Sequence, residues 1–397
     1  MVQQHSEAEI RPFQIEVPQA DLDDLNERLA RTRWPDELPC AGWDYGVPLG
    51  YLKKLAEHWR TSYNWRKYES WLNGFPQFTT IIDGTNIHFF HVRSHEPTAL
   101  PLLLIHGWPG SIMEFTQLIE PLTNPRAYGG DPKDAFHLVI PSIPGFGFSG
   151  PTRDSGWDIN RISRAFSVLM GRLGYESYGA HGGDAGAMIS RKLARINSTN
   201  LIGVHLTYEP SSVPSNDQDP SELTNLSESE QERVRISAQR KSEFSRKELG
   251  YAMIQSTKPQ TLSYGLTDSP VGQLAWIVEK FRAFTDSVEF PEEAVDRDQM
   301  LTNVMLYWLT GTANSSARLY YEMANAGSEW GKPEEPSAVP TGIAVFPFDT
   351  SLPVRYLAER TNNIIHWTEF ERGGHFPGME EPDLLIRDLQ DFFRKLR

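Results

Sequence analysis

The run Gly182-Gly183-Asp184-Ala185-Gly186, which follows the short strand-like segment 175–180, places the strongest constraint on the fold. Glycine at 182 and 186 permits a sharp turn from a strand into a helix with close backbone contact, the geometry required by the motif G-x-S-x-G. The residue at the centre of such a turn projects from the end of a strand. A chain built around this turn is expected to form a mainly parallel sheet with helices on both faces.

The central residue of the turn is an aspartate, which changes the expected chemistry. A carboxylate is a poor nucleophile toward esters, because it leaves more easily than the alkoxide that it would expel. It can displace a leaving group from a saturated carbon and form an alkyl ester that water then hydrolyses. Taken alone, Asp184 would more often be a turn residue or a helix N-cap, so the functional interpretation depends on the rest of the chain.

Composition narrows the class of partner. The formal net charge of −14 argues against nucleic acid or an anionic membrane surface, because both attract basic proteins, and a neutral small molecule is expected instead. The single cysteine, Cys40, excludes an internal disulfide, and the histidines show no metal-ligand spacing, so neither metal nor organic cofactor is expected. Residues 1–10 form neither a signal peptide nor a membrane-spanning run, which favours a cytoplasmic location.

The order of sequence patterns predicts four regions. Residues 1–95 contain amphipathic helices and a terminal hairpin, and they are expected to wrap around a larger domain. Strand-like and helix-like segments alternate over 96–208, which predicts the first part of an α/β core. Helical patterns over 209–338 predict an inserted cap, and the α/β pattern returns over 339–397 to complete the core.

Hydrophobic periodicity predicts the individual elements. Helices are expected at 21–34 and 51–66, a hairpin turn at Asp83-Gly84, and a helix that opens at the capping box Ser227-x-x-Glu230. The other expected elements are the strands 101–105, 137–141, 175–180, 201–206, 342–346 and 363–367, and the helices 112–122, 158–173 and 383–396.

A carboxylate nucleophile needs an acid and a histidine, which follow it in that order in parallel-sheet hydrolases. Asp349 comes directly after the predicted strand 342–346, and His375 lies in the loop Gly-Gly-His-Phe-Pro. Both would project at the carboxyl edge of the sheet, where ligands of such sheets bind. A neutral histidine oriented by a buried carboxylate can take a proton from water and direct the hydroxide at an ester.

Hydrolysis of an ester creates an oxyanion that needs preorganised donors. The backbone amides of Ala185 and Trp108 are the expected pair, because one follows the nucleophile and the other lies in the loop after the strand 101–105. His106, before Gly107 in that loop, is expected to have a structural role.

Several motifs together resemble the microsomal-type epoxide hydrolases. These motifs are His-Gly-Trp-Pro-Gly-Ser at 106–111, the aspartate turn at 182–186, and the run from Tyr-Ala-Met-Ile-Gln at 251 through Asp-Ser-Pro-Val-Gly at 268 to Trp-Ile-Val-Glu-Lys at 276–280. The resemblance covers nearly the whole chain, and residues 8–118 are similar to the N-terminal domain of that family. It implies an α/β-hydrolase fold with an inserted helical cap and an N-terminal extension.

The resemblance also implies roles for single residues. The nucleophile falls on Asp184, the charge-relay acid on Asp349 and the general base on His375. Two cap tyrosines donate protons to the epoxide oxygen in this family, and they match Tyr251 and Tyr320. The implied reaction converts an epoxide and water into a vicinal diol without a cofactor.

Tyr321 competes with its neighbour Tyr320, but adjacent residues of a helix point about 100° apart, so both are not expected to reach one oxygen. Two departures from the family pattern stand out. Microsomal members carry a membrane-anchoring helix that this sequence lacks, which favours a soluble branch. Some relatives use glutamate where this chain has Asp349.

Two other functions fit part of the pattern. A haloalkane dehalogenase shares the aspartate nucleophile, the histidine base and the ester intermediate, but it would bind halide through N–H donors such as Trp108 instead of using tyrosines. A catalytically silent ligand-binding protein of the same fold would be expected to have lost part of the nucleophile, acid and base set.

The substrate pocket is the least constrained feature. The aromatic residues Trp108, Phe148, Trp308 and Phe376 are candidates for lining an apolar pocket, and each could equally belong to the core. The tryptophan-rich N-terminal segment and the cap could support a homodimer.

Overall fold

A central β-sheet organises the chain in the computed structural model, which describes residues 9–210, 226–326 and 335–397. Within these residues the sheet has nine strands in the order β1-β2-β3-β5-β4-β6-β7-β8-β9. The strands from β5 through β4 to β9 are parallel, whereas β1, β2 and β3 add to the β5 side in antiparallel fashion. The bounds are β1 Arg11–Pro12, β2 Gln77–Ile82, β3 Thr85–Val92, β4 Leu100–Ile105, β5 Phe136–Pro141, β6 Tyr178–Gly182, β7 Leu201–Leu206, β8 Pro340–Val345 and β9 Asn363–Glu369.

The hairpin predicted before residue 95 is present as β2 and β3. Its turn residues Asp83 and Gly84 both have positive φ, at 50° and 72°, as a tight two-residue connection requires. Because β3 pairs with β5, this part of the region 1–95 extends the main sheet. The helices of the same region lie elsewhere.

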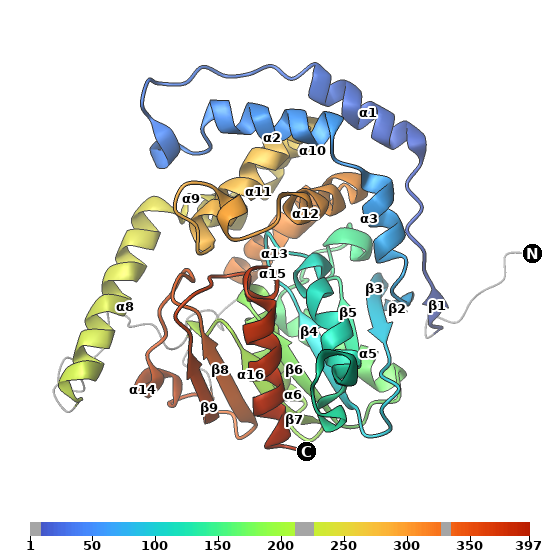
Figure 1. The fold of residues 1–397 in the computed structure, drawn as a ribbon, viewed down its shortest axis with the longest axis vertical. Coiled ribbons are helices and arrows are strands. Elements are labelled where there is room, and N and C mark those ends of the chain that lie inside the picture. The colour runs from blue at the N-terminus through green and yellow to red at the C-terminus, as the bar shows by residue number, and fades with distance from the viewer. Residues whose placement is uncertain (1–8, 211–225, 327–334) are drawn as a thin grey trace, which may run out of the picture.

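Helices cover both faces of the sheet (Figure 1). Helix α16 (Pro382–Arg394) crosses in front of the strands in this view, and α5 (Ile159–Arg172) and α6 (Asp184–Ile196) pack together behind them. The phenyl rings of Phe392 and Phe393 fit where strands carry glycine, since a Cβ at Gly179 would lie 2.3 Å from the Phe393 ring. Other helices of the core are α4 Ile119–Thr123, α14 Arg355–Ala358 and α15 Pro377–Glu380.

A helical cap is inserted between β7 and β8, as the sequence predicts. Its first described helix opens at Ser227, where the side chains of Ser227 and Glu230 form the expected capping box. The predicted range 209–338 includes 211–225 and 327–334, which lie outside the described residues. The cap helices are α8 Glu228–Lys247, α9 Gly250–Thr257, α10 Pro259–Asp268, α11 Pro270–Phe284, α12 Arg297–Thr310 and α13 Ala313–Asn325.

Three predicted helices were wrong in extent. The segment 51–66 forms two helices, α2 (Leu49–Thr61) and α3 (Trp65–Leu72), and the Asn64 side chain caps the second by accepting the Lys67 amide. The segment 112–122 is a 3₁₀ helix over Ile112–Leu118 followed by the short α4. The first N-terminal helix, α1 (Gln19–Ala30), ends before the predicted Trp34.

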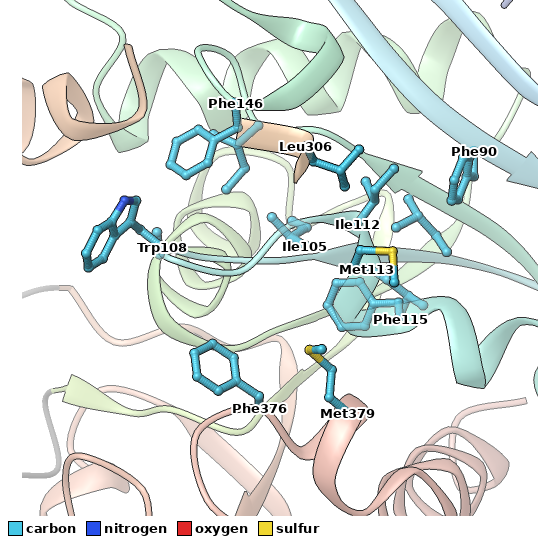
Figure 2. Close-up of a cluster of buried hydrophobic side chains, with 14 of the residues drawn as sticks. Phe90, Ile105, Trp108, Ile112, Met113, Phe115, Phe146, Leu306, Phe376 and Met379 are labelled. Carbon is cyan, nitrogen blue, oxygen red and sulfur yellow. The ribbon is translucent and has the colours of Figure 1, made fainter. Parts of the chain in front are cut away.

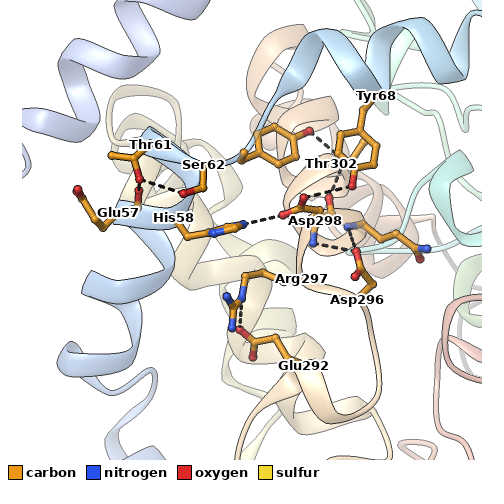
Figure 3. Close-up of polar contacts among 12 residues, drawn as sticks. Glu57, His58, Thr61, Ser62, Tyr68, Glu292, Asp296, Arg297, Asp298 and Thr302 are labelled. Carbon is orange, nitrogen blue, oxygen red and sulfur yellow. Dashed lines mark hydrogen bonds and ion pairs between the residues drawn. The ribbon is translucent and has the colours of Figure 1, made fainter.

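Helices α1 and α2 lie across the cap on the side away from the sheet, and α3 lies beside α12 (Figure 1). His58 Nε2 of α2 donates to Asp298 of α12 at 2.7 Å, and the hydroxyl of Tyr68 in α3 donates to the same carboxylate at 3.3 Å (Figure 3). Tyr63 pairs with Thr302 at 2.9 Å. The N-terminal extension is therefore connected to α12 by hydrogen bonds between partly buried side chains.

Candidate active site

Asp184 occupies the turn between β6 and α6 with a left-handed backbone, at a φ of 49°. The turn fits only because its flanking residues are small: a Cβ on Gly186 would lie 1.9 Å from the Ile105 carbonyl oxygen. A Cβ on Gly107 would likewise lie 2.3 Å from Asp184 itself. The sequence therefore brings the loop after β4 into direct contact with the carboxylate.

Two backbone amides hold the Asp184 carboxylate. The Trp108 amide donates to Oδ1 at 3.0 Å, and the Ala185 amide donates to the same carboxylate. These are the donors expected for an oxyanion. The Asp184 side chain keeps 24% of its surface exposed.

His375 lies between the other two predicted residues. Its Nδ1 is 2.6 Å from Asp349 Oδ1, and its Nε2 is 3.6 Å from Asp184 Oδ2. The Asp349 oxygen also accepts from the amide and hydroxyl of Thr350, at 2.6 and 3.1 Å. The Asp349 carboxylate therefore fixes the imidazole with Nε2 directed at the nucleophile.

Charge couples these three residues. Burial disfavours the imidazolium, but the carboxylates of Asp349 and Asp184 outweigh it and raise the pKa of His375 well above its usual value. Burial likewise opposes ionisation of Asp184, yet the hydrogen bond and charge of His375 and the two amides lower the pKa of its carboxyl. Both shifts favour the charged forms, an imidazolium at His375 and a carboxylate at Asp184.

The two predicted cap tyrosines meet above the Asp184 carboxylate. Tyr251 begins α9 and Tyr320 lies on α13, and the Tyr320 hydroxyl donates to the Tyr251 oxygen at 3.4 Å. The Trp108 ring stacks on Tyr251 with centroids 4.8 Å apart and meets Tyr320 edge-on at 5.9 Å. Tyr321 is instead 41% exposed.

The aromatic residues proposed as a pocket lining separate into two groups. Trp108 contacts the tyrosines, and Phe376 meets the His375 ring at 5.0 Å, so both border the site; Figure 2 shows them at one side of the buried cluster that includes Ile105. Phe148 packs against Phe13 and His88, at 5.1 and 5.2 Å. Trp308, on α12, is half-buried against the main core.

Helix α12 fastens the cap to the loop that carries the Trp108 amide. The Asn303 amide donates to the Pro109 carbonyl at 2.7 Å, and the Tyr307 hydroxyl donates to the Gly110 carbonyl at 2.6 Å. On the other side of this loop, His106 contacts the Gly107 carbonyl at 3.0 Å and accepts the Ile143 amide at 3.2 Å. His106 thus has the structural contacts expected of it.

Sequence reasoning missed a third carboxyl group in the site, that of Glu114. A Cβ at Gly110 would lie 3.1 Å from one of its oxygens, and a Cβ at Gly183 would lie 3.8 Å from the other. Burial raises the pKa of Glu114 to about 8, and the nearby carboxylate of Asp184 contributes. An acid inside the apolar run Ile112-Met113-Glu114-Phe115 is the sequence signal that could have identified it.

Tyr208 and Glu380 were also missed. The Tyr208 ring meets His375 at 6.3 Å, and burial raises the pKa of this phenol. The Glu380 carboxylate accepts the amides of Phe376 and Asp286, each at 2.8 Å, which ties the His375 loop to the end of the cap. Among the described residues, no three His, Cys, Asp or Glu side chains gather as metal ligands do.

The fold and the site together define an α/β-hydrolase with an aspartate at the nucleophile position. Residues 10–115 match the family model described as the epoxide hydrolase N terminus, and 101–283 match that of the alpha/beta hydrolase fold. Epoxide hydrolase 1 of Sus scrofa is 36% identical to this chain, over 96% of this chain and 88% of its own length. A relative from Stigmatella aurantiaca is 45% identical, over 98% and 86%.

Solved structures agree with these relatives. The juvenile hormone epoxide hydrolase of Bombyx mori superposes with a TM-score of 0.89 at 31% identity, covering 98% of this chain and 95% of its own. The epoxide hydrolase of Aspergillus niger gives 0.83 at 31% identity, with 98% and 97% covered. This chain belongs to the epoxide hydrolase family. In its described residues, no helix combines the length and apolar character needed to cross a membrane.

Proposed function

We propose that Asp184, Tyr251 and Tyr320 carry out the ring-opening step of epoxide hydrolysis in this chain. The amides of Trp108 and Ala185 engage the Asp184 carboxylate, which leaves Oδ2 to attack an epoxide carbon from the side opposite the breaking bond. The alkoxide that forms needs a proton at neutral pH. The phenols supply it, because tyrosine is protonated there.

The second step returns the free carboxylate. His375 Nε2 takes a proton from water, the hydroxide adds to the ester carbon on Asp184, and the amides of Trp108 and Ala185 stabilise the resulting oxyanion. Asp349 stabilises the imidazolium. The products are the vicinal diol and the regenerated enzyme.

One observation carries this proposal: an unbroken series of contacts joins Tyr320, Tyr251, Trp108 and Asp184 to His375 and Asp349. The proposed acids, nucleophile and base therefore gather around one partly exposed carboxylate, that of Asp184. A haloalkane dehalogenase would not need the phenols of Tyr251 and Tyr320 as proton donors, because a halide ion leaves without a proton.

Trapping of the ester tests the assignment of the nucleophile. The His375→Gln variant should form the ester and hydrolyse it slowly, so acid quenching after incubation with styrene oxide should leave the intact epoxide mass on the peptide that contains Asp184. The Asp184→Asn/His375→Gln double variant is the control and should carry no adduct. An adduct formed from a haloalkane alone would contradict the proposal.

We also propose a homodimer through the N-terminal segment and the cap. Large hydrophobic side chains remain exposed there, namely Leu38, Tyr45, Val288 and Phe290. Gel filtration with light scattering should give twice the chain mass of 45.1 kDa, and a monomer mass would remove the idea.

A further inference from the structure

A buried lysine in the cap has no part in the reaction as described so far. Lys280 lies on α11, at the end of the Trp-Ile-Val-Glu-Lys motif, and is almost inaccessible to solvent. Its ammonium group is 2.7 Å from Glu279 Oε2 and donates to the carboxylate and the carbonyl of Glu248 at 3.1 and 3.2 Å. A buried lysine is costly to keep charged unless it is paired in this way.

The ammonium group lies against the ring of a proposed proton donor. Lys280 Nζ is 5.0 Å from the centroid of the Tyr251 ring and 5.4 Å from that of Phe284. The indole of Trp108 stacks on Tyr251 at 4.8 Å with an interplanar angle of 12°, so one face of the phenol ring is already covered. The cation therefore takes the other face, and the ring is held between the two.

This arrangement distinguishes the two tyrosines. In the described part of the chain no cation lies over the Tyr320 ring, whereas Tyr251 has Lys280. The Tyr320 hydroxyl donates to the Tyr251 oxygen, which leaves the Tyr251 proton free for the substrate. A phenolate ring is richer in electrons than a phenol ring, so a cation on its face favours loss of the proton.

We propose that Lys280 is a positioning residue that makes Tyr251, rather than Tyr320, the tyrosine that transfers its proton to the epoxide oxygen. The inference rests on the role proposed above for Tyr251. As Asp184 Oδ2 bonds to carbon and the ring C–O bond breaks, the Tyr251 O–H bond breaks and its proton passes to the alkoxide. The phenolate is stabilised by the Tyr320 hydroxyl and Lys280, and it takes up the proton that His375 releases once the Asp184 charge is lost. The neutral imidazole then takes a proton from water, which restores the imidazolium.

The acidic groups around Tyr251 oppose ionisation of its phenol. Burial raises the pKa of Tyr251, and the carboxylates of Asp184, Glu279 and Glu248 raise it further, whereas the hydrogen bond from Tyr320 lowers it. The Lys280 ammonium offsets part of this negative charge at the ring face. Loss of Lys280 would leave Glu248 and Glu279 without their shared partner next to the ring that must become negative.

A double-mutant cycle on the rate of ester formation tests the proposal. Rapid quench with styrene oxide measures formation and hydrolysis of the ester separately. Lys280→Met should slow ester formation about tenfold, in keeping with the loss of one cation–π contact, and should leave ester hydrolysis unchanged. The same substitution should have less than a twofold effect in a Tyr251→Phe background, and its full effect in a Tyr320→Phe background.

Two further variants separate this role from a general packing role. Glu279→Gln/Lys280→Met removes the buried pair together and should fold with the same defect, and Lys280→Arg should retain most of the rate. Equal losses from Lys280→Met with and without the Tyr251 hydroxyl, or equal losses in both chemical steps, would overturn the inference. If Tyr251→Phe itself left ester formation unchanged, the proposed role of Tyr251 would fail instead.

Discussion

The charge on Asp184 controls the charge on His375. In the free enzyme the carboxylate lies 3.6 Å from Nε2 and helps to keep the imidazole protonated, a state in which it cannot act as a base. In the proposed mechanism, conversion of Asp184 into an ester removes that negative charge. The first chemical step would therefore prepare His375 to act as the base of the second.

The pH dependence of the two steps should show this coupling. Because ester formation removes one of the charges that raise the pKa of His375, ester hydrolysis should increase with pH around a lower pKa than His375 shows in the free enzyme. Single-turnover hydrolysis rates and an NMR titration of His375 give the two values. In Asp184→Asn, which also lacks the charge, the free-enzyme pKa should fall, and an unchanged value would contradict the coupling.

Glu114 should make the stability of the protein depend on pH. Its pKa is raised from an ordinary 4.5 to about 8 in the folded state, so the folded protein retains a proton that the unfolded chain releases. This contribution is complete below pH 4.5 and is lost as pH rises to 8, by at most about 1.4 kcal/mol for each pH unit. Compared with the wild type, Glu114→Gln should therefore gain unfolding free energy between pH 5 and pH 8 in denaturant titrations. Glu120→Gln, at an exposed acid nearby, should show no such gain.

The carboxylate of Asp388 connects helix α16 to two strands of the sheet. Asp388 accepts from His205 of β7 and from His366 of β9, each at 2.8 Å. His205 Nδ1 lies 2.9 Å from Nδ1 of His181 on β6, close to the nucleophile turn. Burial opposes ionisation of Asp388, but the hydrogen bonds from His205 and His366 hold its pKa well below the usual range.

Removal of this carboxylate should destabilise the protein more than removal of another acid on the same helix. Asp388→Ala leaves His205 and His366 without their acceptor and should lower the free energy of unfolding by about 3 kcal/mol. Asp391→Ala removes an exposed ion pair with Arg394 and should change it by no more than about 0.5 kcal/mol. Urea denaturation measures the free energy of unfolding of both variants. Equal losses would show that the hydrogen bonds of Asp388 with His205 and His366 do not stabilise the protein more than an exposed ion pair does.

The elements were largely predictable where periodicity is strong. The strands at 201–206 and the hairpin around Asp83 follow from local patterns alone. The break before α3 was missed because apolar residues keep a helical spacing across it, although Asn64 is an N-cap residue. Glu114 carries a local signal, an acid inside an apolar run, but its proximity to Asp184 joins segments far apart in the sequence. Lys280 was missed because its contact with the Tyr251 ring joins two separate helices.

In the described residues, the N-terminal extension does not supply a residue of the candidate site, but it is connected to that site through helix α12. His58 of α2 and Tyr63, which follows α2, contact Asp298 and Thr302 at the start of α12, and Asn303 and Tyr307 of the same helix contact the loop of the Trp108 amide. The N-terminal extension therefore supports, through α12, the amide that donates to Asp184.

Weaker packing of α2 against α12 should increase the mobility of the loop 106–111. Trp59 of α2 is buried, and its indole N–H donates to Met305 Sδ of α12 at 3.2 Å. Trp59→Ala should therefore increase amide hydrogen exchange in α12 and at 106–111 at least tenfold more than in β8, as read by mass spectrometry. Tyr45→Ala, which removes a side chain that is 80% exposed, is the control and should change neither.

The place of the cap in the sequence separates the residues proposed for the two chemical steps. In the proposed mechanism, ring opening needs residues of both parts, since the core supplies Asp184 and the insertion between β7 and β8 supplies Tyr251 and Tyr320. Hydrolysis of the ester uses Asp349, His375 and the amides of Trp108 and Ala185, all of which belong to the core. Changes in the insertion should therefore alter ring opening more directly than ester hydrolysis.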